Sequence, residues 1–508
     1  MAGGSRVTTV VEKPRGWIVK DFAASIVVFL VAMPLCMGIA IASGVSPEKG
    51  LITGIIGGLV VGFFAGSPLQ VSGPAAGLAV IVFELVRDHG ITVLGPILLL
   101  AGLLQLLAGV FKLGGWFRAI SPAVVHGMLA GIGALIVVGQ FHTMFDAKPL
   151  SNGLENLAAM PARILGLSND IGSTELALFL GLFTIALMLG WDRFRPLALK
   201  LVPSALIGVV GATLIAFFLG LDVVRVDVPA SIIAAIDTPG AGFLAPLVNP
   251  ALLLSAVAIA FIASAETLLS AAATDRMHDG VRTDYNKELR AQGIGNMLCG
   301  AAGALPMTGV IVRSSANVQA GATSRWSTVM HGAWILGFVA LLPWVLREIP
   351  MAALGGVLVV TGAKLVSLKH VRHLFHNYGL LPAAIWAVTF VLVLTTDLLT
   401  GVLVGLALSL VELAPSFRRL RLTVATANDA DRCRVRLDGA ATFISLPKLN
   451  QALDNLPEGK PLTIELGGVP SIDHSCAEML REWLDRQRKR GFDIELLGSA
   501  SQLKRLTV

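Results

Sequence analysis

Long apolar runs separated by short polar loops occupy most of the chain. A membrane-spanning helix needs about 20 mainly apolar residues, and this pattern predicts seven spans in the first half of the chain and seven in the second. The predicted spans of the first half are Phe22–Ala42, Leu51–Phe64, Gly73–Val86, Ile91–Phe111, Ala123–Phe141, Leu176–Gly190 and Pro203–Leu219. Those of the second half are Ala251–Leu269, Ala291–Gly303, Thr308–Val318, Val329–Val345, Ala352–Val366, Leu380–Leu394 and Leu398–Leu413.

Basic residues follow the alternation of these loops. If the N-terminus is cytoplasmic, the loops that fall inside are the ones rich in Lys and Arg, whereas the outer loops Asp146–Asp170 and Leu221–Asn249 are poor in them. Cytoplasmic loops of membrane proteins carry this excess of positive charge. The pattern therefore predicts an even number of spans with both termini in the cytoplasm. The inner-loop residues are Lys112, Arg118, Arg193, Arg195, Lys200, Arg276, Arg282, Lys287, Arg290, Arg325, Lys364, Lys369 and Arg372.

Two apolar stretches are broken by Pro, Gly and Ser at matching places in the two halves. The first is Ala65–Gly77, AGSPLQVSGPAAG, and the second is Ala304–Ser315, ALPMTGVIVRSS. Each follows a similar Ile-Gly-containing segment, so the halves read as an internal repeat; the alternative is chance similarity between glycine-rich apolar segments. A repeat of seven spans has an odd number of crossings, so its second copy is inverted in the membrane. Paired broken segments of this kind indicate a transporter binding site.

Composition supports a membrane protein. Of 508 residues, 55% are hydrophobic and 14% are charged, against about 25% charged in soluble domains, and the mean hydropathy is +0.77. The net charge of +6 reflects loop orientation and does not predict nucleic-acid binding. The four cysteines lack metal-ligand spacing, so no metal site or disulfide framework is expected. No nucleophile–base pair or phosphate-binding loop is found, which argues against an enzyme. We expect no cofactor.

Three units follow from this pattern. Residues 1–20 are a polar, basic segment on the cytoplasmic side and not a signal peptide. Residues 21–415 form the transmembrane domain, with one repeat at about 21–220 and the other at about 250–415. Residues 425–508 alternate strands and helices, which predicts a small cytoplasmic α/β domain. Its expected strands are Cys433–Leu437, Leu462–Leu466 and Asp493–Leu497, and its expected helices are Pro447–Leu456 and Ala477–Arg490.

The broken stretches are suited to an anion. If Thr308 begins one half-helix and Gly73 or Pro74 begins the other, two N-termini point at each other, and each carries about half a positive charge. Gly309 permits a ligand to approach closely. Unpaired backbone at membrane depth is tolerated only beside a cavity or inside the protein. The alternative is a pair of ordinary kinked helices.

Three side chains add candidate chemistry. Arg313 follows Thr308 by five residues and, being costly in lipid, is expected to face the bundle interior, where it either binds the anion or pairs with a carboxylate. Glu266 shares a helix face with Ser270 four residues on and is a candidate for proton or sodium coupling. The alternative is a constitutive Glu266–Arg313 bridge. His126 is expected to be a packing residue rather than a proton relay.

These residues resemble the sulfate permease (SulP) family, the relatives of prestin and of bacterial bicarbonate and plant sulfate transporters. The similarity rests on Val71-Ser-Gly-Pro-Ala-Ala-Gly77, Ser121-Pro-Ala-Val-Val125, Asn286-Lys-Glu-Leu289 and Gly293-Ile-Gly-Asn296, and the tail resembles a STAS domain at Ile472-Asp473.

The resemblance implies an α-helical membrane protein with a UraA-like inverted repeat of seven plus seven spans, divided into a mobile core and a gate domain that often dimerises. It places the anion at Ser72, Gly73, Thr308 and Gly309, puts Arg313 near it, and puts Glu266 at the coupling carboxylate. In the tail, Asp473-His-Ser-Cys476 departs from the phosphorylatable pattern of related soluble domains.

The sequence thus predicts a secondary transporter of a small inorganic oxyanion, with sulfate favoured and bicarbonate close behind. We expect elevator-like motion driven by H⁺, with Na⁺ as the alternative coupling ion. The rivals are a sodium-coupled bicarbonate symporter, a dicarboxylate or nucleobase carrier, and an uncoupled anion channel or voltage-driven motor. The expected partners are the lipid bilayer of the inner or plasma membrane, a second copy of the chain, and a cytoplasmic regulator at the STAS domain.

Overall fold

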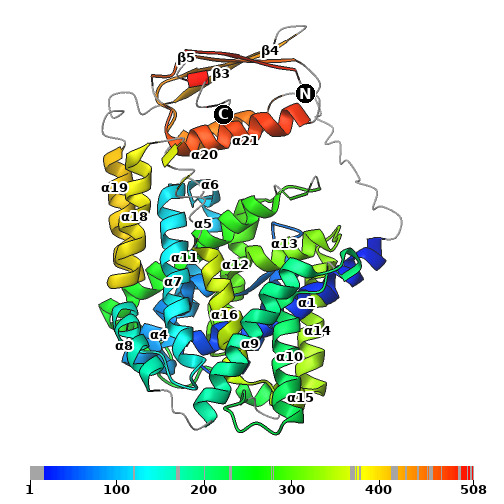
Figure 1. Ribbon diagram of the computed structural model, residues 1–508. Helices are drawn as coiled ribbons and strands as arrows, with labels where there is room; N and C mark the ends of the chain where they lie inside the picture. Colours follow the sequence, from blue (N-terminus) through cyan, green and yellow to red (C-terminus); the bar gives the residue numbers. More distant parts are fainter. Residues whose placement is uncertain are drawn as a thin grey trace.

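The computed structural model is a bundle of helices with a small sheet domain at one end (Figure 1). It describes residues 17–506, except for 118–120, 151, 167–171, 200, 228–231, 276, 279, 367–371, 373–374, 377–378, 413–421, 429–431, 443–444, 455, 457–460, 471, 490–492, 500–501 and 504–505. Most of the predicted segment 1–20 therefore lies outside the described residues. The predicted inner-loop residues Arg118, Lys200, Arg276 and Lys369 also lie outside them.

Helices occupy all of the predicted spans. Those of the first half are α1 (Trp17–Ala42), α2 (Pro47–Ile56) continued by a π-helical turn η1 (Gly57–Val61) and α3 (Gly62–Phe64), α4 (Ala79–His89) after a 3₁₀ turn η2 (Ala76–Leu78), α5 (Leu94–Val110) after η3 (Ile91–Val93), α7 (Pro122–Thr143), α9 (Ser173–Phe194) and α10 (Ser204–Phe218). Those of the second half are α11 (Pro250–Asp275), α12 (Tyr285–Ala301), α13 (Ile311–Gln319), α14 (Trp326–Leu341) with α15 (Pro343–Leu346), α16 (Met351–Leu365), α18 (Leu380–Thr395) and α19 (Leu398–Glu412).

Within the described residues, six helical segments are long and apolar enough to cross a membrane, by length and composition alone. These are Trp17–Ala42, Pro47–Phe64, Ile91–Val110, Pro122–Thr143, Ser173–Phe194 and Pro250–Asp275, and five shorter apolar helices accompany them. Hydropathy predicted these segments because lipid accepts apolar side chains on every face of a helix, and such helices read as uninterrupted apolar runs.

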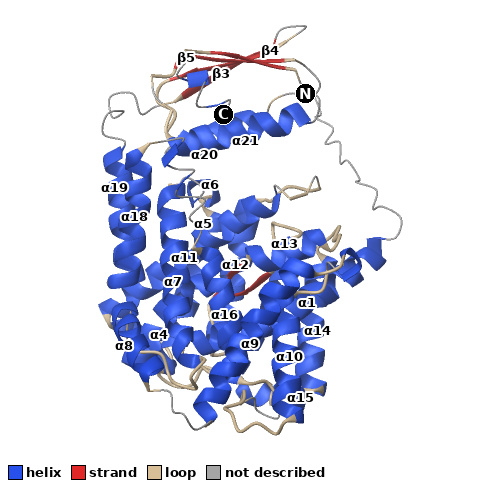
Figure 2. Ribbon diagram, in the orientation of Figure 1, coloured by secondary structure: helices blue, strands red, loops and turns tan. Residues whose placement is uncertain are grey.

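The predicted start of the half-helices is wrong. Gly73 and Thr308 begin no helix; they face each other in a short antiparallel ribbon of β1 (Ser72–Pro74) and β2 (Met307–Gly309), which Figure 2 shows among the helices. The helical turns begin later, at Ala76 and Ile311. Backbone groups at membrane depth need partners inside the protein, and strand pairing supplies them where the chain is not helical. An antiparallel pair of equivalent segments also has the two-fold relation that an inverted repeat requires.

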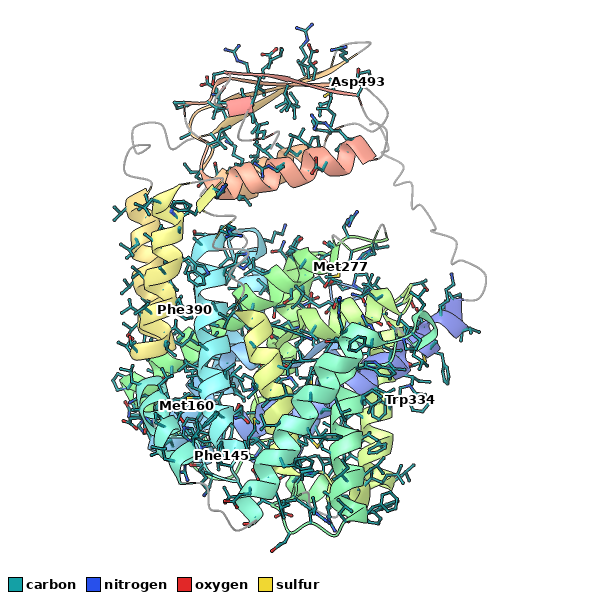
Figure 3. All side chains as sticks on the ribbon, viewed as in Figure 1. Phe145, Met160, Met277, Trp334, Phe390 and Asp493 are labelled. Atoms are coloured by element: carbon teal, nitrogen blue, oxygen red, sulfur yellow. The ribbon has the colours of Figure 1, made fainter. Side chains whose placement is uncertain are left out.

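The membrane helices pack in two groups. The core group contains α1, α2, α5, α11, α12, α13 and α14 around the ribbon, with α12 packed along α5. The gate group contains α7 against α16 and α18, α9 against α10 and α16, and α18 against α19. At the edge of the core group, Trp334 of α14 (Figure 3) donates its indole N–H to Ser25 Oγ of α1 at 3.0 Å. This arrangement agrees with the division into core and gate.

Hydropathy missed the polar ends of two helices, which are largely buried inside the protein. Helix α11 runs six residues past the predicted Leu269, to Asp275. Helix α12 begins six residues before the predicted Ala291, because Asp284 caps it by accepting from the backbone N–H groups of Asn286 and Lys287, both at 3.0 Å. The outer loop predicted over 146–170 contains an amphipathic helix, α8 (Gly153–Leu165).

The C-terminal domain is a four-stranded sheet in the order β3-β4-β5-β6, with a separate buried apolar core. Strands β4 (Cys433–Asp438), β5 (Leu462–Gly468) and β6 (Ile494–Leu497) and helices α20 (Leu446–Asp454) and α21 (His474–Lys489) confirm the predicted elements. Strand β3 (Thr423–Asn428), which pairs antiparallel with β4, was not predicted. The two helices lie on the side of the sheet that faces the helical bundle (Figure 1).

Candidate functional site

The ribbon is the point where the two repeats meet, and its two faces have different surroundings. Gly73 is opposite Thr308 and Ser72 is opposite Gly309. Residues directly opposite each other share a face, and neighbours along a strand alternate. Thr308 therefore lies on the Gly73 face, whereas Ser72 lies with Gly309 on the other. The five predicted anion residues are brought to one ribbon, but not to one face.

Arg313 covers the Gly73 face. It is the third residue of α13, is fully buried, and places its Nη1 atom 2.0 Å from where a Cβ on Gly73 would be. Any side chain at position 73 would thus displace the guanidinium. The prediction that Arg313 faces the bundle interior is confirmed.

In the described part of the chain the guanidinium has no carboxylate partner, and the group beside it is the Cys36 thiol of α1. All three nitrogens of Arg313 lack a hydrogen bond, and so does the buried Oγ1 of Thr308 on the same ribbon face. Leaving a buried charge unpaired costs several kcal/mol, and an unsatisfied buried hydroxyl adds about 1–3 kcal/mol. This face therefore carries donors that an anion would satisfy.

Glu266 of α11 is half-buried and belongs to neither ribbon face. Its Oε2 lies 2.7 Å from where a Cβ on Gly77 would be and has no hydrogen-bond partner among the described residues, while the carboxylate group accepts from the backbone N–H of Gly77. Gly77 is in the first turn that leads into α4, so the carboxylate lies at the positive end of a helix. Among the described residues Glu266 and Arg313 form no ion pair, which contradicts the bridge considered as an alternative. Ser270 is buried one turn further along α11.

The Ser72 face is engaged by the protein itself. Gln292 of α12 donates its amide N–H to Ser72 Oγ at 2.6 Å and to Glu288 Oε1 at 3.0 Å, and Glu288 Oε2 accepts from Ser67 N at 2.9 Å. Gln292 and Glu288 are fully buried. Sequence reasoning missed this chain of polar groups, although Glu288 and Gln292 are four residues apart and so share a helix face.

The Gly309 backbone is also engaged. Its N–H donates to Thr267 Oγ1 at 3.1 Å, and a Cβ at position 309 would lie 1.2 Å from Gln70 Nε2. The predicted close approach at Gly309 is real, but the group that approaches it is the Gln70 side chain. Position 309 has no room for a larger residue.

Side chains from other helices hold strand β2 in place. Asn296 accepts from Met307 N at 2.8 Å and donates to Met307 O at 3.1 Å, so its amide pairs with the strand as a further strand would. Thr53 makes the same two-way contact with Leu305, at 2.9 and 3.1 Å. Together with the bond from Gly309 N to Thr267 Oγ1, the contact at Met307 fixes Thr308 between two anchored neighbours.

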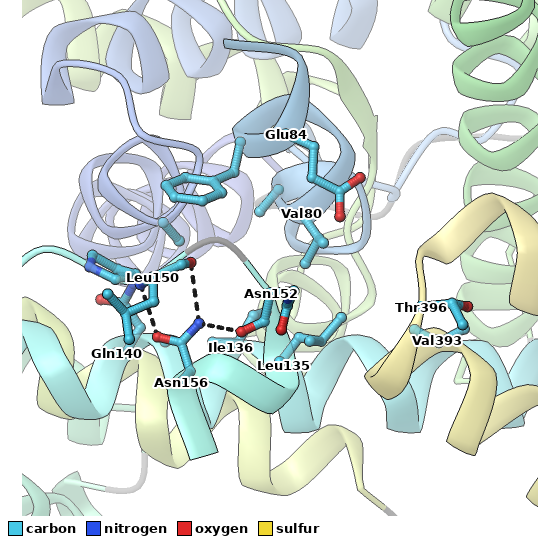
Figure 4. A pocket seen from close by; sticks show the side chains of 16 residues that line it. Val80, Glu84, Leu135, Ile136, Gln140, Leu150, Asn152, Asn156, Val393 and Thr396 are labelled. Atoms are coloured by element: carbon cyan, nitrogen blue, oxygen red, sulfur yellow. Dashed lines mark hydrogen bonds between the residues drawn. The ribbon is translucent and has the colours of Figure 1, made fainter. Parts of the chain in front are cut away.

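Cavities lie between core and gate on the side away from the sheet domain. A cavity of about 1320 Å³ is lined by six charged residues among others: Glu48, Arg87, Asp146, Lys148, Arg225 and Asp227. A smaller one of about 50 Å³ adjoins it between α4, α7 and α8 (Figure 4), where Asn156 holds the loop at Leu150 through hydrogen bonds of 2.9 and 3.1 Å. His126 lies on α7 of the gate group. The described residues contain no group of three or more potential metal ligands.

Comparisons with known proteins agree with this architecture. A model of the sulfate permease family matches residues 18–389, and a model of the Mlab-type STAS domain matches residues 424–507. The putative sulfate transporter YvdB of Bacillus subtilis is 29% identical, with 96% of this chain and 92% of that protein covered. The bicarbonate transporter BicA of Picosynechococcus is 23% identical, with 96% and 89% covered.

Two solved structures share the fold. The transmembrane domain of a cyanobacterium bicarbonate transporter BicA superposes with a TM-score of 0.64 at 23% identity, covering 77% of this chain and 97% of that one. The overall structure of SLC26A9 superposes with a TM-score of 0.68 at 16% identity, covering 97% and 87%. The fold is therefore that of a helical membrane transporter with a C-terminal STAS domain.

Proposed function

The chain belongs to the sulfate permease family, and from this premise we propose that it is a secondary transporter of a small inorganic oxyanion. Sulfate is the favoured substrate and bicarbonate the second, because the relatives include proteins named for each. The core group moves relative to the gate group in an elevator-like cycle and carries the anion at the ribbon.

One observation supports this proposal most strongly, namely the unpaired guanidinium of Arg313 against the ribbon. A fully buried arginine that has no hydrogen-bond partner among the described residues is costly, and a guanidinium binds two oxygens of one oxyanion in two parallel hydrogen bonds. The anion then contacts Arg313 and Thr308 on the Gly73 face, while Ser72 and Gly309 support the ribbon from behind.

Proton coupling follows from the position of Glu266. An ionised Glu266 beside Gly77 competes with a substrate anion for the positive end of the same helix. Protonation of Glu266 removes that competition, so a proton and an anion load together. Sodium is the alternative, since a bound cation would neutralise the carboxylate equally well.

The orientation, assembly and regulation of the protein complete the proposal. Both termini lie in the cytoplasm of the cell's inner or plasma membrane, two copies associate through the gate group, and the STAS domain is a docking surface for a cytoplasmic regulator. Cysteine scanning of the α8 region with an impermeant thiol reagent tests the orientation, and light scattering of the purified protein tests the dimer.

Uptake into liposomes tests the function. Purified protein is reconstituted, and labelled sulfate and bicarbonate are supplied under separately imposed proton and sodium gradients. Uptake that follows an inward proton gradient supports the proposal, and uptake that follows only sodium identifies the sodium-coupled alternative. Competition by fumarate or uracil would identify a carrier of another substrate class, and currents beyond carrier rates would identify a channel.

A further inference from the structure

Thr267 connects the helix that carries Glu266 to both halves of the ribbon region. Its Oγ1 accepts from Gly309 N of β2 at 3.1 Å, and its backbone oxygen accepts from Gln70 Nε2, ahead of β1, at 3.2 Å. Thr267 is fully buried and Gln70 is 1% exposed. One residue of α11 is thus bonded to a segment from each repeat.

The side chains of Glu266 and Thr267, which are neighbours on α11, reach different parts of the protein. Neighbouring residues of an α-helix are rotated by about 100° from each other, so Glu266 and Thr267 reach different partners. Glu266 lies against Gly77 at the start of α4, whereas Thr267 bonds to the residue that follows Thr308. A small movement of α11 at Glu266 therefore changes the contact at Gly309.

We propose that Thr267 couples the protonation of Glu266 to the anion-binding strand β2, as a positioning residue; this rests on the proposed function. When Glu266 is ionised, its attraction to the first turn of α4 holds α11 in the present position. Protonation removes this attraction, α11 shifts, and the Thr267 hydroxyl moves Gly309 and with it Thr308. By linkage, anion binding changes the proton affinity of Glu266 by the same factor.

Few other charged groups lie on the elements that surround Glu266. Of the elements packed against α11, α13 carries Arg313 and α12 carries Lys287, Glu288 and Arg290, whereas α5, β2 and η2 carry no charged residue. Helix α11 itself adds only Asp275 at its end. Glu288 is bonded to Gln292 and Ser67, so the pH response at this position is assigned to Glu266.

A pair of matched variants tests the proposal. Thr267→Val keeps the shape of the side chain and removes the hydroxyl, and Thr267→Ser keeps the hydroxyl. The KM for labelled sulfate is measured in liposomes at one acidic and one alkaline external pH. The wild type and Thr267→Ser should show a lower KM at acidic pH. In Thr267→Val the KM at acidic pH should rise by about three- to tenfold, the equivalent of one hydrogen bond. The KM at alkaline pH divided by the KM at acidic pH should therefore fall to about one in this variant.

The outcomes separate this inference from the function on which it rests. A wild type whose KM ignores pH overturns proton coupling and the coupling role together. A pH-dependent wild type with an equally pH-dependent Thr267→Val overturns the coupling role alone. If Thr267→Val does not fold, Gln70→Met breaks the second contact and should lower the same ratio; an unchanged ratio in that variant refutes the proposal.

Discussion

Replacing Arg313 by methionine should change anion affinity and anion-free stability in opposite directions. Methionine is unbranched, fits helices and fills irregular space, so Arg313→Met removes the charge with little change in packing. The arginine is fully buried and its three nitrogens have no hydrogen-bond partner among the described residues. In the anion-free protein the substitution therefore removes a penalty, and in the anion-bound protein it removes a ligand.

General interaction energies give the expected size of the loss of anion affinity and of the gain in anion-free stability. Two unit charges 4 Å apart attract by about 4 kcal/mol at an effective dielectric constant of about 20. A hydrogen bond to a charged group is worth about 1.5–3 kcal/mol net of desolvation, which predicts a loss of affinity of about ten- to hundredfold. Replacing a buried ion pair by apolar residues of similar volume can stabilise a protein by about 1–4 kcal/mol. A buried arginine without a carboxylate partner lacks even the attraction of such a pair, so anion-free Arg313→Met should melt at a higher temperature than the wild type.

Thermal unfolding of the purified protein, with and without sulfate, measures both effects. Sulfate should raise the Tm of the wild type, since ligand at about 100 times Kd adds about 2.7 kcal/mol. In Arg313→Met the same sulfate concentration should add only about 0.4–1.4 kcal/mol, because the affinity is ten- to hundredfold lower. Arg290→Met is the matched control, because Arg290 is exposed and carries the same charge; it should keep the sulfate response. An equal sulfate response in Arg313→Met, or a lower Tm of that variant without sulfate, would refute the reasoning.

Three further predictions follow from other residues. Glu266→Gln should abolish the rise of liposome sulfate uptake as external pH falls; a retained rise contradicts proton coupling. Burial raises the pKa of Asp146, whose Oδ2 accepts from Val224 N at 3.2 Å, so the native state favours its protonated form and loses stability as pH rises past the ordinary aspartate pKa. Asp146→Asn should therefore raise Tm, most at neutral and alkaline pH; a pH-independent difference contradicts this. Burial also raises the pKa of the Cys476 thiol, which donates to Thr442 O, so maleimide should label Cys476 only after denaturation, as mass spectrometry of its peptide would show.

Hydropathy was sufficient to predict the membrane helices. An apolar run has one favourable environment, lipid or the interior of a bundle, and the helices found over Pro122–Thr143 and Ser173–Phe194 reflect that. The same signal fails where a polar helix end is buried in the protein, as in the turns of α12 that follow Asp284, since a cap and hydrogen-bonded polar residues such as Glu288 carry no hydropathy. It fails also at Gly153–Leu165, where one apolar face alternates with a polar one.

The pairing of the two ribbon strands could not be predicted from the sequence. The Gly and Pro content correctly indicated broken helices, but strand pairing between Gly73 and Thr308 depends on two segments more than 200 residues apart. Which face each residue joins depends on that pairing, because a shift of one residue moves every side chain to the other face. The roles of Thr267, Gln70 and Gln292 follow from distances that no local pattern encodes.

A structure determined with selenate tests whether the anion binds at Arg313 and Thr308. Selenate has the shape and charge of sulfate, and its selenium is located by anomalous scattering in a crystal. We expect a selenium peak on the Gly73 face of the ribbon, with selenate oxygens about 2.7–3.2 Å from an Arg313 nitrogen and from Thr308 Oγ1. A peak elsewhere, with the Arg313 guanidinium bonded to a protein carboxylate, would contradict it.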